Sequence, residues 1–181
     1  PQQRRRAIMI ARVLFGAVLL WAGMAAAGDL PESRSGRARV IDGDTIAISG
    51  ERIRIAAIDA CESDQTGLRE GRFWPCGRIA RDQLTAMIGD RPVFCAIIDR
   101  DRFGRLVGQC FAGSLDIGLA MVRAGAAETM FSYLPDGHGI GLRDYELAEW
   151  RARQSRLGIW SAEIETPQRH RSGSEALPEP R

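Results

Sequence analysis

The sequence contains no lysine, so all 25 of its basic residues are arginines. A guanidinium is planar and offers a fork of donors that matches two oxygens of one phosphate or carboxylate, whereas an ammonium acts as a point charge. Every basic contact of this chain is therefore of the kind suited to a bidentate grip on phosphate. A bias in genome composition explains the missing lysine at least as well.

A strong excess of charge is also missing. The formal net charge of +2 depends on four arginines at positions 4, 5, 6 and 12, in a head segment that looks removable. Without them, 21 basic residues face 23 acidic residues, which leaves a net charge of −2. A domain that binds nucleic acid through its bulk charge is strongly basic. The overall charge therefore gives no evidence for nucleic acid, and any phosphate-binding site must be local.

Histidine and cysteine are too scarce and too widely spaced for a convincing zinc site. The two histidines, His138 and His170, lie in polar loop or tail sequence and receive no chemical role. The four cysteines include no C-x-x-C pair, which zinc sites commonly contain. Disulfides formed in an oxidising compartment are the better interpretation. The cysteines concerned are Cys61, Cys76, Cys95 and Cys110.

The start of the chain holds its one long apolar run. A basic beginning, an apolar stretch over 13–24 and small residues at Ala25 and Ala27 are typical of a secretory signal cleaved before Gly28. The alternative is an uncleaved anchor, because residues 7–27 could nearly span a bilayer apart from one arginine. Both interpretations predict export, to the periplasm or out of the cell.

The remainder has the size and apolar content of one ordinary domain with a real core. Near-alternating, β-branched segments predict strands over 38–44, 45–59, 91–99 and 105–113, with a hairpin turn at Ser49 and Gly50. Apolar stripes at helical spacing predict helices around 80–88, 117–124 and 142–157. These elements make a compact α+β plan. Short twisted hairpins could close into a small barrel, but the pattern alone does not prove closure.

The predicted domain organisation has four parts. The head segment covers 1–27 and a short polar linker covers 28–36. The folded domain covers 37–161. A polar, proline-containing tail covers 162–181, and we expect it to be disordered because it lacks enough apolar residues to offset the entropy of ordering.

Two acidic clusters end consecutive predicted strands. Asp42 and Asp44 flank a glycine before Thr45, and turn chemistry alone would account for them. A second cluster follows at Asp59–Ser63. If a hairpin closes at Ser49 and Gly50, paired residue numbers add up to 99, and both clusters lie on the same side of the sheet without being made adjacent. Clustered carboxylates without histidine suit a hard cation such as calcium.

Three further charged residues lie near these clusters. Arg54 is located between them, and Asp101 and Arg105 belong to a later turn over 99–105. Taken alone, each is ordinary, as the strand partner of a carboxylate or part of a polar hairpin tip. Carboxylates for a metal together with arginines for phosphate make a phosphodiester site, in which Asp101 would be a supporting residue.

The ordered combination of VIDGDT, RIRIAAIDACES, DRDRFGR, MVRAGAAETMFSY and RLGIW resembles the staphylococcal nuclease family over about residues 37–161. Each of these motifs is weak alone, but their occurrence together in this order is specific. The resemblance implies a small five-stranded OB-fold β-barrel with three helices packed on it. It also implies calcium-dependent hydrolysis of DNA and/or RNA that leaves 3′-phosphate ends.

The resemblance assigns the calcium ligands by matching positions. Asp44 and Asp59 would supply carboxylates, and Ala60 would supply its main-chain carbonyl, where the family usually has threonine. That change should be tolerated, because a backbone oxygen does not depend on the side chain. Asp42 and Thr45 would support the same turn.

The resemblance also assigns the residues that act on the nucleic acid. Glu62 corresponds to the general base, and Arg54 and Arg105 correspond to the pair that grips the phosphate. Phe131 and Tyr133 lie where the family places two tyrosines beside the nucleotide. Phe131 lacks the hydroxyl, which leaves stacking but puts a hydrogen bond in doubt.

Cys61 stands where the family usually has proline, next to Glu62. Lost rigidity there would loosen the base unless a disulfide restores it. A symmetric hairpin over 93–112, with paired numbers that add up to 205, makes Cys95 and Cys110 direct neighbours within reach of a disulfide. A bulge near the turn would shift that register by one. Cys61 is then left to pair with Cys76.

Two other functions, a binding module and a structural domain, explain the charged residues less completely than a nuclease does. A non-catalytic OB-type module that binds nucleic acid would have little reason to keep the whole set of carboxylates and arginines. A calcium-stabilised structural domain would leave the two arginines without a task. We therefore expect an enzyme with a nucleic acid substrate. We also expect a monomer, with no membrane partner once the head segment has been removed.

Overall fold

The computed structural model of the protein describes residues 32–175, and the predicted head segment 1–27 lies outside them. Most of the strands form one curled sheet with the order β1-β8-β9-β4-β3-β2, in which β10 pairs with β9. All neighbours are antiparallel except β4 and β9. The bounds are β1 (Ser33–Gly36), β2 (Ala38–Val40), β3 (Thr45–Ile48), β4 (Glu51–Ile55), β8 (Val93–Arg100), β9 (Leu106–Ala112) and β10 (Leu115–Asp116).

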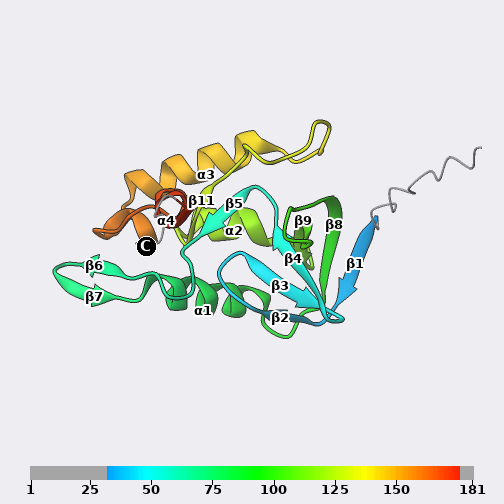
Figure 1. The fold of residues 1–181 in the computed structure, drawn as a ribbon, viewed down its shortest axis with the longest axis horizontal. Coiled ribbons are helices and arrows are strands. Elements are labelled where there is room, and N and C mark those ends of the chain that lie inside the picture. The colour runs from blue at the N-terminus through cyan, green and yellow to red at the C-terminus, as the bar shows by residue number, and fades with distance from the viewer. Residues whose placement is uncertain (1–31, 176–181) are drawn as a thin grey trace, which may run out of the picture.

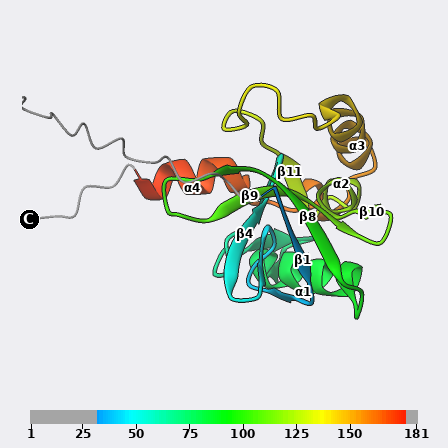
Figure 2. The ribbon, with the colours of Figure 1, turned by 90° about the vertical axis from the view of Figure 1, so that its right-hand side faces the viewer.

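One bent stretch of chain belongs to both ends of this sheet. β1 pairs with β8 at one end, and β2 pairs with β3 at the other. A single residue, Arg37, separates β1 from β2. The sheet is therefore curled so that its first strand reaches both edges, and Figure 2 shows β1 running beside β8.

Two small sheets and four α-helices complete the part of the chain that the structure describes. β5 (Ile58–Ala60) pairs with β11 (Ala127–Thr129), and β6 (Gly67–Arg69) pairs with β7 (Arg72–Trp74). In Figure 1, α1 and α3 lie on opposite sides of the molecule, and the β6–β7 hairpin extends outward. The helices are α1 (Cys76–Ile88), α2 (Ile117–Arg123), α3 (Leu142–Gln154) and α4 (Pro167–Glu175), and a short 3₁₀ helix covers Gly158–Ser161.

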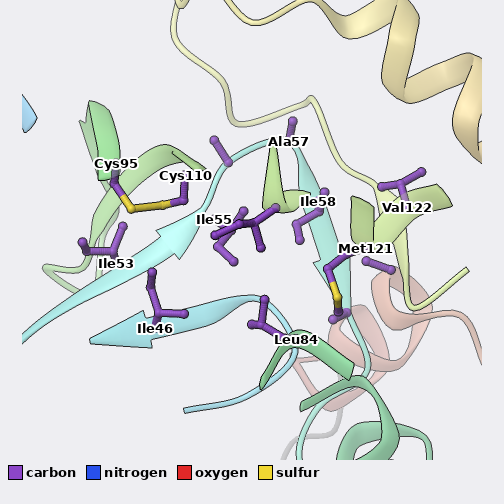
Figure 3. Close-up of a cluster of buried hydrophobic side chains, with 14 of the residues drawn as sticks. Ile46, Ile53, Ile55, Ala57, Ile58, Leu84, Cys95, Cys110, Met121 and Val122 are labelled. Atoms are coloured by element: carbon purple, nitrogen blue, oxygen red, sulfur yellow. A yellow bond between two sulfur atoms is a disulfide. The ribbon is translucent and has the colours of Figure 1, made fainter. Parts of the chain in front are cut away.

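The core lies between the concave face of the sheet and α1 and α2. Ile46, Ile53 and Ile55 from the sheet meet Leu84 from α1 and Met121 from α2, and all five are fully buried (Figure 3). Burying a side chain of this size stabilises the fold by about 1.5–3 kcal/mol. The predicted apolar stripes of these helices are therefore the faces that cover the sheet.

The hairpin registers agree with the sequence. Ile48 pairs with Glu51 in the first hairpin, so paired numbers add up to 99 as predicted. In the second hairpin Cys95 pairs with Cys110, as predicted, and the two form a disulfide. Next to the turn the pairing is different, because Arg100 pairs with Leu106 and these numbers add up to 206. A bulge between Ile97 and Asp99 returns the rest of the ladder to the predicted register. The pairing of the cysteines is thus correct, although the assumed symmetry of the turn is not.

Three features differ from the sequence analysis. The expected linker contains β1, because backbone pairing with β8 and an ion pair between Arg34 and Glu51 order its polar residues. The β6–β7 hairpin was not predicted. The tail expected to be disordered contains α4, a fourth helix where three were expected, and polar contacts with the domain hold it.

None of the described helices combines the length and the hydrophobicity needed to cross a membrane.

Candidate active site

The turn from Asp42 to Thr45 is held by its own polar groups. The backbone N–H of Asp44 donates to Oδ1 of Asp42 over 3.1 Å, and the Thr45 hydroxyl donates to Oδ1 of Asp44 over 2.8 Å. A Cβ on Gly43 would lie 2.7 Å from Cβ of Ala60, so glycine lets this turn approach β5. Turn chemistry therefore orients the Asp44 carboxylate.

Arg54 joins the two acidic clusters. Its Nη1 lies 2.8 Å from Oδ2 of Asp44, and its Nη2 lies 2.8 Å from Oδ1 of Asp59. All three side chains are buried, with 5%, 6% and 0% of their surface exposed, respectively. The hairpin brings Arg54 opposite Thr45, while Asp59 lies on β5. The structure thus brings the Asp44 turn and the Asp59 cluster together around Arg54, whereas the hairpin register alone placed them only on the same side of the sheet.

A second arginine reaches the same carboxylates from α4. Nη2 of Arg171 lies 2.8 Å from Oε1 of Glu62 and 3.8 Å from Oδ2 of Asp44, and it also donates to Oδ1 of Asp59. Arg171 is 112 residues away from Asp59 in the sequence. One guanidinium nitrogen therefore faces three carboxylates.

The carboxylates influence one another's protonation. Burial and the neighbouring charge of Asp44 raise the pKa of Asp42 to about 6. Burial also favours the neutral form of Asp44, but the positive charges of Arg54 and Arg171 outweigh it and lower its pKa. Burial raises the pKa of Asp59, although both arginines oppose the effect. The nearby arginines thus hold Asp44 in its charged form, while burial favours the neutral forms of Asp42 and Asp59.

The loop that carries Glu62 is held from several sides. Cys61 and Cys76 form the predicted disulfide, with their Cα atoms 5.8 Å apart. The backbone N–H of Glu62 donates to Oε1 of Gln65 over 3.1 Å. A Cβ on Gly77 would lie 1.8 Å from the Glu62 carbonyl oxygen, so glycine lets the first turn of α1 pack on the loop. These contacts provide the rigidity that a proline at position 61 would otherwise give.

Arg105 lies at the tip of the β8–β9 hairpin. Its Nε is 2.7 Å from Oδ2 of Asp101, and its backbone N–H donates to Oδ1 of the same residue over 2.9 Å. Asp101 therefore fixes both the backbone and the side chain of Arg105, and its supporting role in a site stays a prediction. The ring of Phe103, 70% exposed, lies 5.7 Å from the Arg105 guanidinium carbon.

Two adjoining surface pockets connect these residues. The first, of about 590 Å³, is lined by Glu62 and Arg105 together with Arg171. The second, of about 440 Å³, is lined by Arg54, Arg105 and Tyr133. The predicted base lines the first pocket and Arg54 lines the second, while Arg105 and Arg171 line both.

The two aromatic residues expected beside the nucleotide lie differently. The Tyr133 ring lines the second pocket, 5.4 Å from the Arg54 guanidinium carbon. Phe131 is half-buried against the main core and is not among the residues that line either pocket. Tyr133 is thus at the predicted pocket and Phe131 is not, and the role of both residues beside a nucleotide stays a prediction.

The donor set suits a hard cation. Oδ2 of Asp44 and Oδ2 of Asp59 are buried and accept no hydrogen bond from the described residues, although Arg54 lies close to the first. Within residues 32–171, no three Asp, Glu, His or Cys side chains come together in a way that could hold a metal ion. Calcium takes six to eight oxygens that include carbonyls and waters, so the predicted set of Asp44, Asp59 and the Ala60 carbonyl does not require a third acidic side chain, and it stays a prediction.

Over residues 52–162 the chain matches a family described as Staphylococcal nuclease homologue. The chain belongs to the staphylococcal nuclease family. The matched range includes Arg54, Asp59, Glu62 and Arg105, while Asp44 lies before it. The prediction of a nuclease of this family is confirmed.

The relatives carry names of more than one kind. "Succinoglycan biosynthesis protein ExoI" of Rhizobium meliloti (strain 1021) is 37% identical over 153 residues, which are 83% of this chain and 76% of the relative. An "Uncharacterized endonuclease" of Escherichia coli O157:H7 is 34% identical over 128 residues, 68% of this chain and 74% of the relative. "Staphylococcal-like nuclease CAN1" of Arabidopsis thaliana is 29% identical over 113 residues, 61% of this chain and 30% of the relative.

Sequence reasoning missed Arg171, which lines both pockets. It lies in a polar tail without apolar periodicity, and no local pattern indicates a contact with residues more than one hundred positions earlier. It also missed Phe103, whose exposed ring at a charged turn was a visible signal.

Proposed function

We propose that the protein is a calcium-dependent endonuclease that hydrolyses phosphodiester bonds of DNA and/or RNA. The observation that carries this proposal is the buried Asp44–Arg54–Asp59 cluster beside a pocket lined by Glu62 and Arg105. Membership of the nuclease family supports the reaction class.

The carboxylates of Asp44 and Asp59 and the carbonyl of Ala60 would hold the calcium. When bound, calcium supplies a positive charge that polarises the phosphate and positions a water. Asp42 and Thr45 would support this set, because they fix the Asp44 carboxylate through hydrogen bonds.

Glu62 would take the proton of the attacking water as its oxygen forms a bond to phosphorus. The bond from phosphorus to the 5′-oxygen of the next nucleotide breaks on the opposite side. The products are a 3′-phosphate and, after that oxygen takes up a proton, a 5′-hydroxyl. A general base contributes about 10²–10⁴-fold to such a step. Glu62 suits this role because a disulfide holds its loop and because the residue itself is half-exposed at the pocket.

Arg54 and Arg105 would bind the phosphate oxygens and stabilise the charge of the transition state. Both line the second pocket, and Asp101 orients Arg105. Preorganised donors of this kind are typically worth about 3–4 kcal/mol of transition-state stabilisation. Tyr133, at the same pocket, offers a ring on which a base can stack.

The finer description of the fold is a five-stranded OB barrel. Its strands would be the bent stretch over 33–40 followed by β3, β4, β8 and β9. The order of pairing supports it, because the bent stretch contacts both β3 and β8. The two disulfides indicate an oxidising compartment, which supports export to the periplasm or the outside of the cell. A monomer without a membrane partner completes the proposal.

The test is cleavage of single-stranded DNA and RNA by the purified protein, in calcium and in excess chelator. We expect activity only with calcium, and 3′-phosphate ends on the products. The double variant Asp44→Asn/Asp59→Asn should be inactive, while Asp64→Asn, which removes an exposed carboxylate from the neighbouring loop, should keep full activity. Full cleavage in chelator, or binding without cleavage under any divalent cation, would contradict the proposal and favour a binding module.

A further inference from the structure

The segment that follows the 3₁₀ helix is tied to the domain around the site. Backbone groups of Leu68 and Glu163 exchange two hydrogen bonds, of 2.7 and 3.1 Å. The Gln65 amide donates to the Glu165 carbonyl over 2.8 Å, two residues before α4 begins. This path crosses the loop that carries Glu62, so the chain reaches α4 already held beside the pocket.

α4 itself makes further contacts through its first turn. The backbone N–H of Gln168 donates to Oε1 of Glu128 over 2.7 Å, and the Gln168 side-chain amide donates to the Thr129 carbonyl over 2.9 Å. Glu128 and Thr129 belong to β11, whose partner β5 carries Asp59. The helix is thereby anchored on the sheet next to the acidic cluster, and Arg171 follows one turn later.

Arg171 occupies the position that a cation would take. Its Nη2 contacts Oδ1 of Asp59, lies 2.8 Å from Oε1 of Glu62 and lies 3.8 Å from Oδ2 of Asp44. Calcium binds its oxygens at about 2.3–2.6 Å. A calcium ion shared by Asp44 and Asp59 would fill the space in which this nitrogen lies. The guanidinium and the ion therefore exclude each other.

We propose that α4 is an intramolecular cap that competes with calcium for the active site. The inference rests on the proposed function, since it concerns the same carboxylates. In the capped state Arg171 neutralises the acidic cluster and pairs with the general base, so its guanidinium competes with a metal ion for the same carboxylates. Calcium binds when α4 moves away, and the apparent calcium affinity falls by the fraction of molecules that are uncapped.

An alternative role for Arg171 is a third arginine that grips the phosphate. That role leaves the guanidinium in place when calcium is bound, so α4 keeps its contacts and its amides stay protected from exchange. The capping role predicts instead that calcium releases α4. Hydrogen exchange of α4 with and without calcium therefore separates the two roles, and calcium affinity measures how strongly the cap competes.

The experiment is calcium titration by calorimetry of the full chain, of Arg171→Ala and of Arg169→Ala. Arg169 is exposed on the same helix, so its variant removes the same charge without touching the carboxylates. We expect Arg171→Ala to bind calcium at least about tenfold more tightly than the wild type, because the competing state is lost. Arg169→Ala should bind as the wild type does.

Hydrogen exchange of the α4 amides provides a second readout. Saturating calcium should increase exchange of the amides of residues 168–171 of the wild type, because the cap is released. If calcium binds with equal or lower affinity in Arg171→Ala, or leaves α4 equally protected, the cap is refuted while the nuclease proposal stands. If neither protein binds calcium, the proposed metal site is refuted and the cap with it.

Discussion

The two arginines expected to bind the phosphate lie in different surroundings. Arg54 lies among the buried carboxylates on the strands, whereas Arg105 lies at an exposed turn. Arg54 is 5% exposed between two aspartates, and Arg105 is 21% exposed beside Asp101. Both are expected to contact the same phosphate. Two residues with the same expected chemical role should therefore contribute very differently to the stability of the fold. Arg54 is part of the fold as well as the site, and Arg105 belongs to the site alone.

The sharpest test of this comparison replaces each arginine in turn. Arg54→Ala removes the buried partner of two carboxylates and leaves them to the more exposed Arg171. Losing one member of a buried ion pair typically costs about 3–5 kcal/mol of unfolding free energy. Arg105→Ala removes a surface ion pair, worth about 0–1 kcal/mol. Urea unfolding in chelator measures both. Arg105→Ala should still lose roughly 10²–10³-fold in turnover. Equal losses of unfolding free energy in the two variants would show that Arg54 does not stabilise the fold more than Arg105 does.

The two disulfides also differ in how close they lie to the predicted base. Each closes a loop with a sequence separation of 15 residues, so the chain-entropy model predicts a similar loss of about 3 kcal/mol when either is removed. Cys61 precedes Glu62, whereas the other pair lies within the β8–β9 ladder. We expect Cys61→Ala/Cys76→Ala to lower turnover and Cys95→Ala/Cys110→Ala to leave it nearly unchanged, measured well below both melting temperatures. The same turnover in both double variants would show that this cross-link does not position the base.

The smallest expected effect concerns Glu128. Burial, together with the charges of Asp59 and Glu149, raises its pKa to about 7, although a hydrogen bond from Gln168 opposes the shift. Between the ordinary glutamate pKa and 7, the folded state holds the proton more tightly than the unfolded state does. The free energy of unfolding therefore falls as the pH rises through this window, by about 3–3.5 kcal/mol at most.

Glu128→Gln keeps an oxygen that can accept the hydrogen bond from Gln168 and removes the titration. The variant should be more stable than the wild type at pH values above that window and should lose its pH dependence there. Thermal melts across the pH range, in chelator, measure this. A wild-type slope that persists in the variant would assign the titration to another group.

Local signals predicted most of the strands and helices, whereas the family resemblance supplied the roles of the site residues, which stay predictions. The Ser49–Gly50 turn set the register that places Arg54 opposite Thr45. The register of the second hairpin indicated the Cys95–Cys110 disulfide, which left Cys61 to pair with Cys76. The bulge at Ile97 and Asp99 could not be predicted, because a single extra residue in a ladder leaves no clear pattern in the sequence.

α4 was missed for a different reason. It is polar throughout, and it is ordered by contacts with residues far earlier in the chain, such as that between Arg171 and Asp59. Such contacts depend on the finished fold. Sequence periodicity reports the burial of apolar faces, and this helix is held by charge and hydrogen bonds instead.

The most direct test of the central claim is the single-turnover cleavage rate of Glu62→Gln at saturating calcium. We expect a loss of roughly 10²–10⁴-fold in this rate. The free energy of unfolding should stay close to that of the wild type, because Glu62 is half-exposed and its loop is held by other groups. A variant that cleaves at the wild-type rate would contradict the assignment of Glu62 as the base.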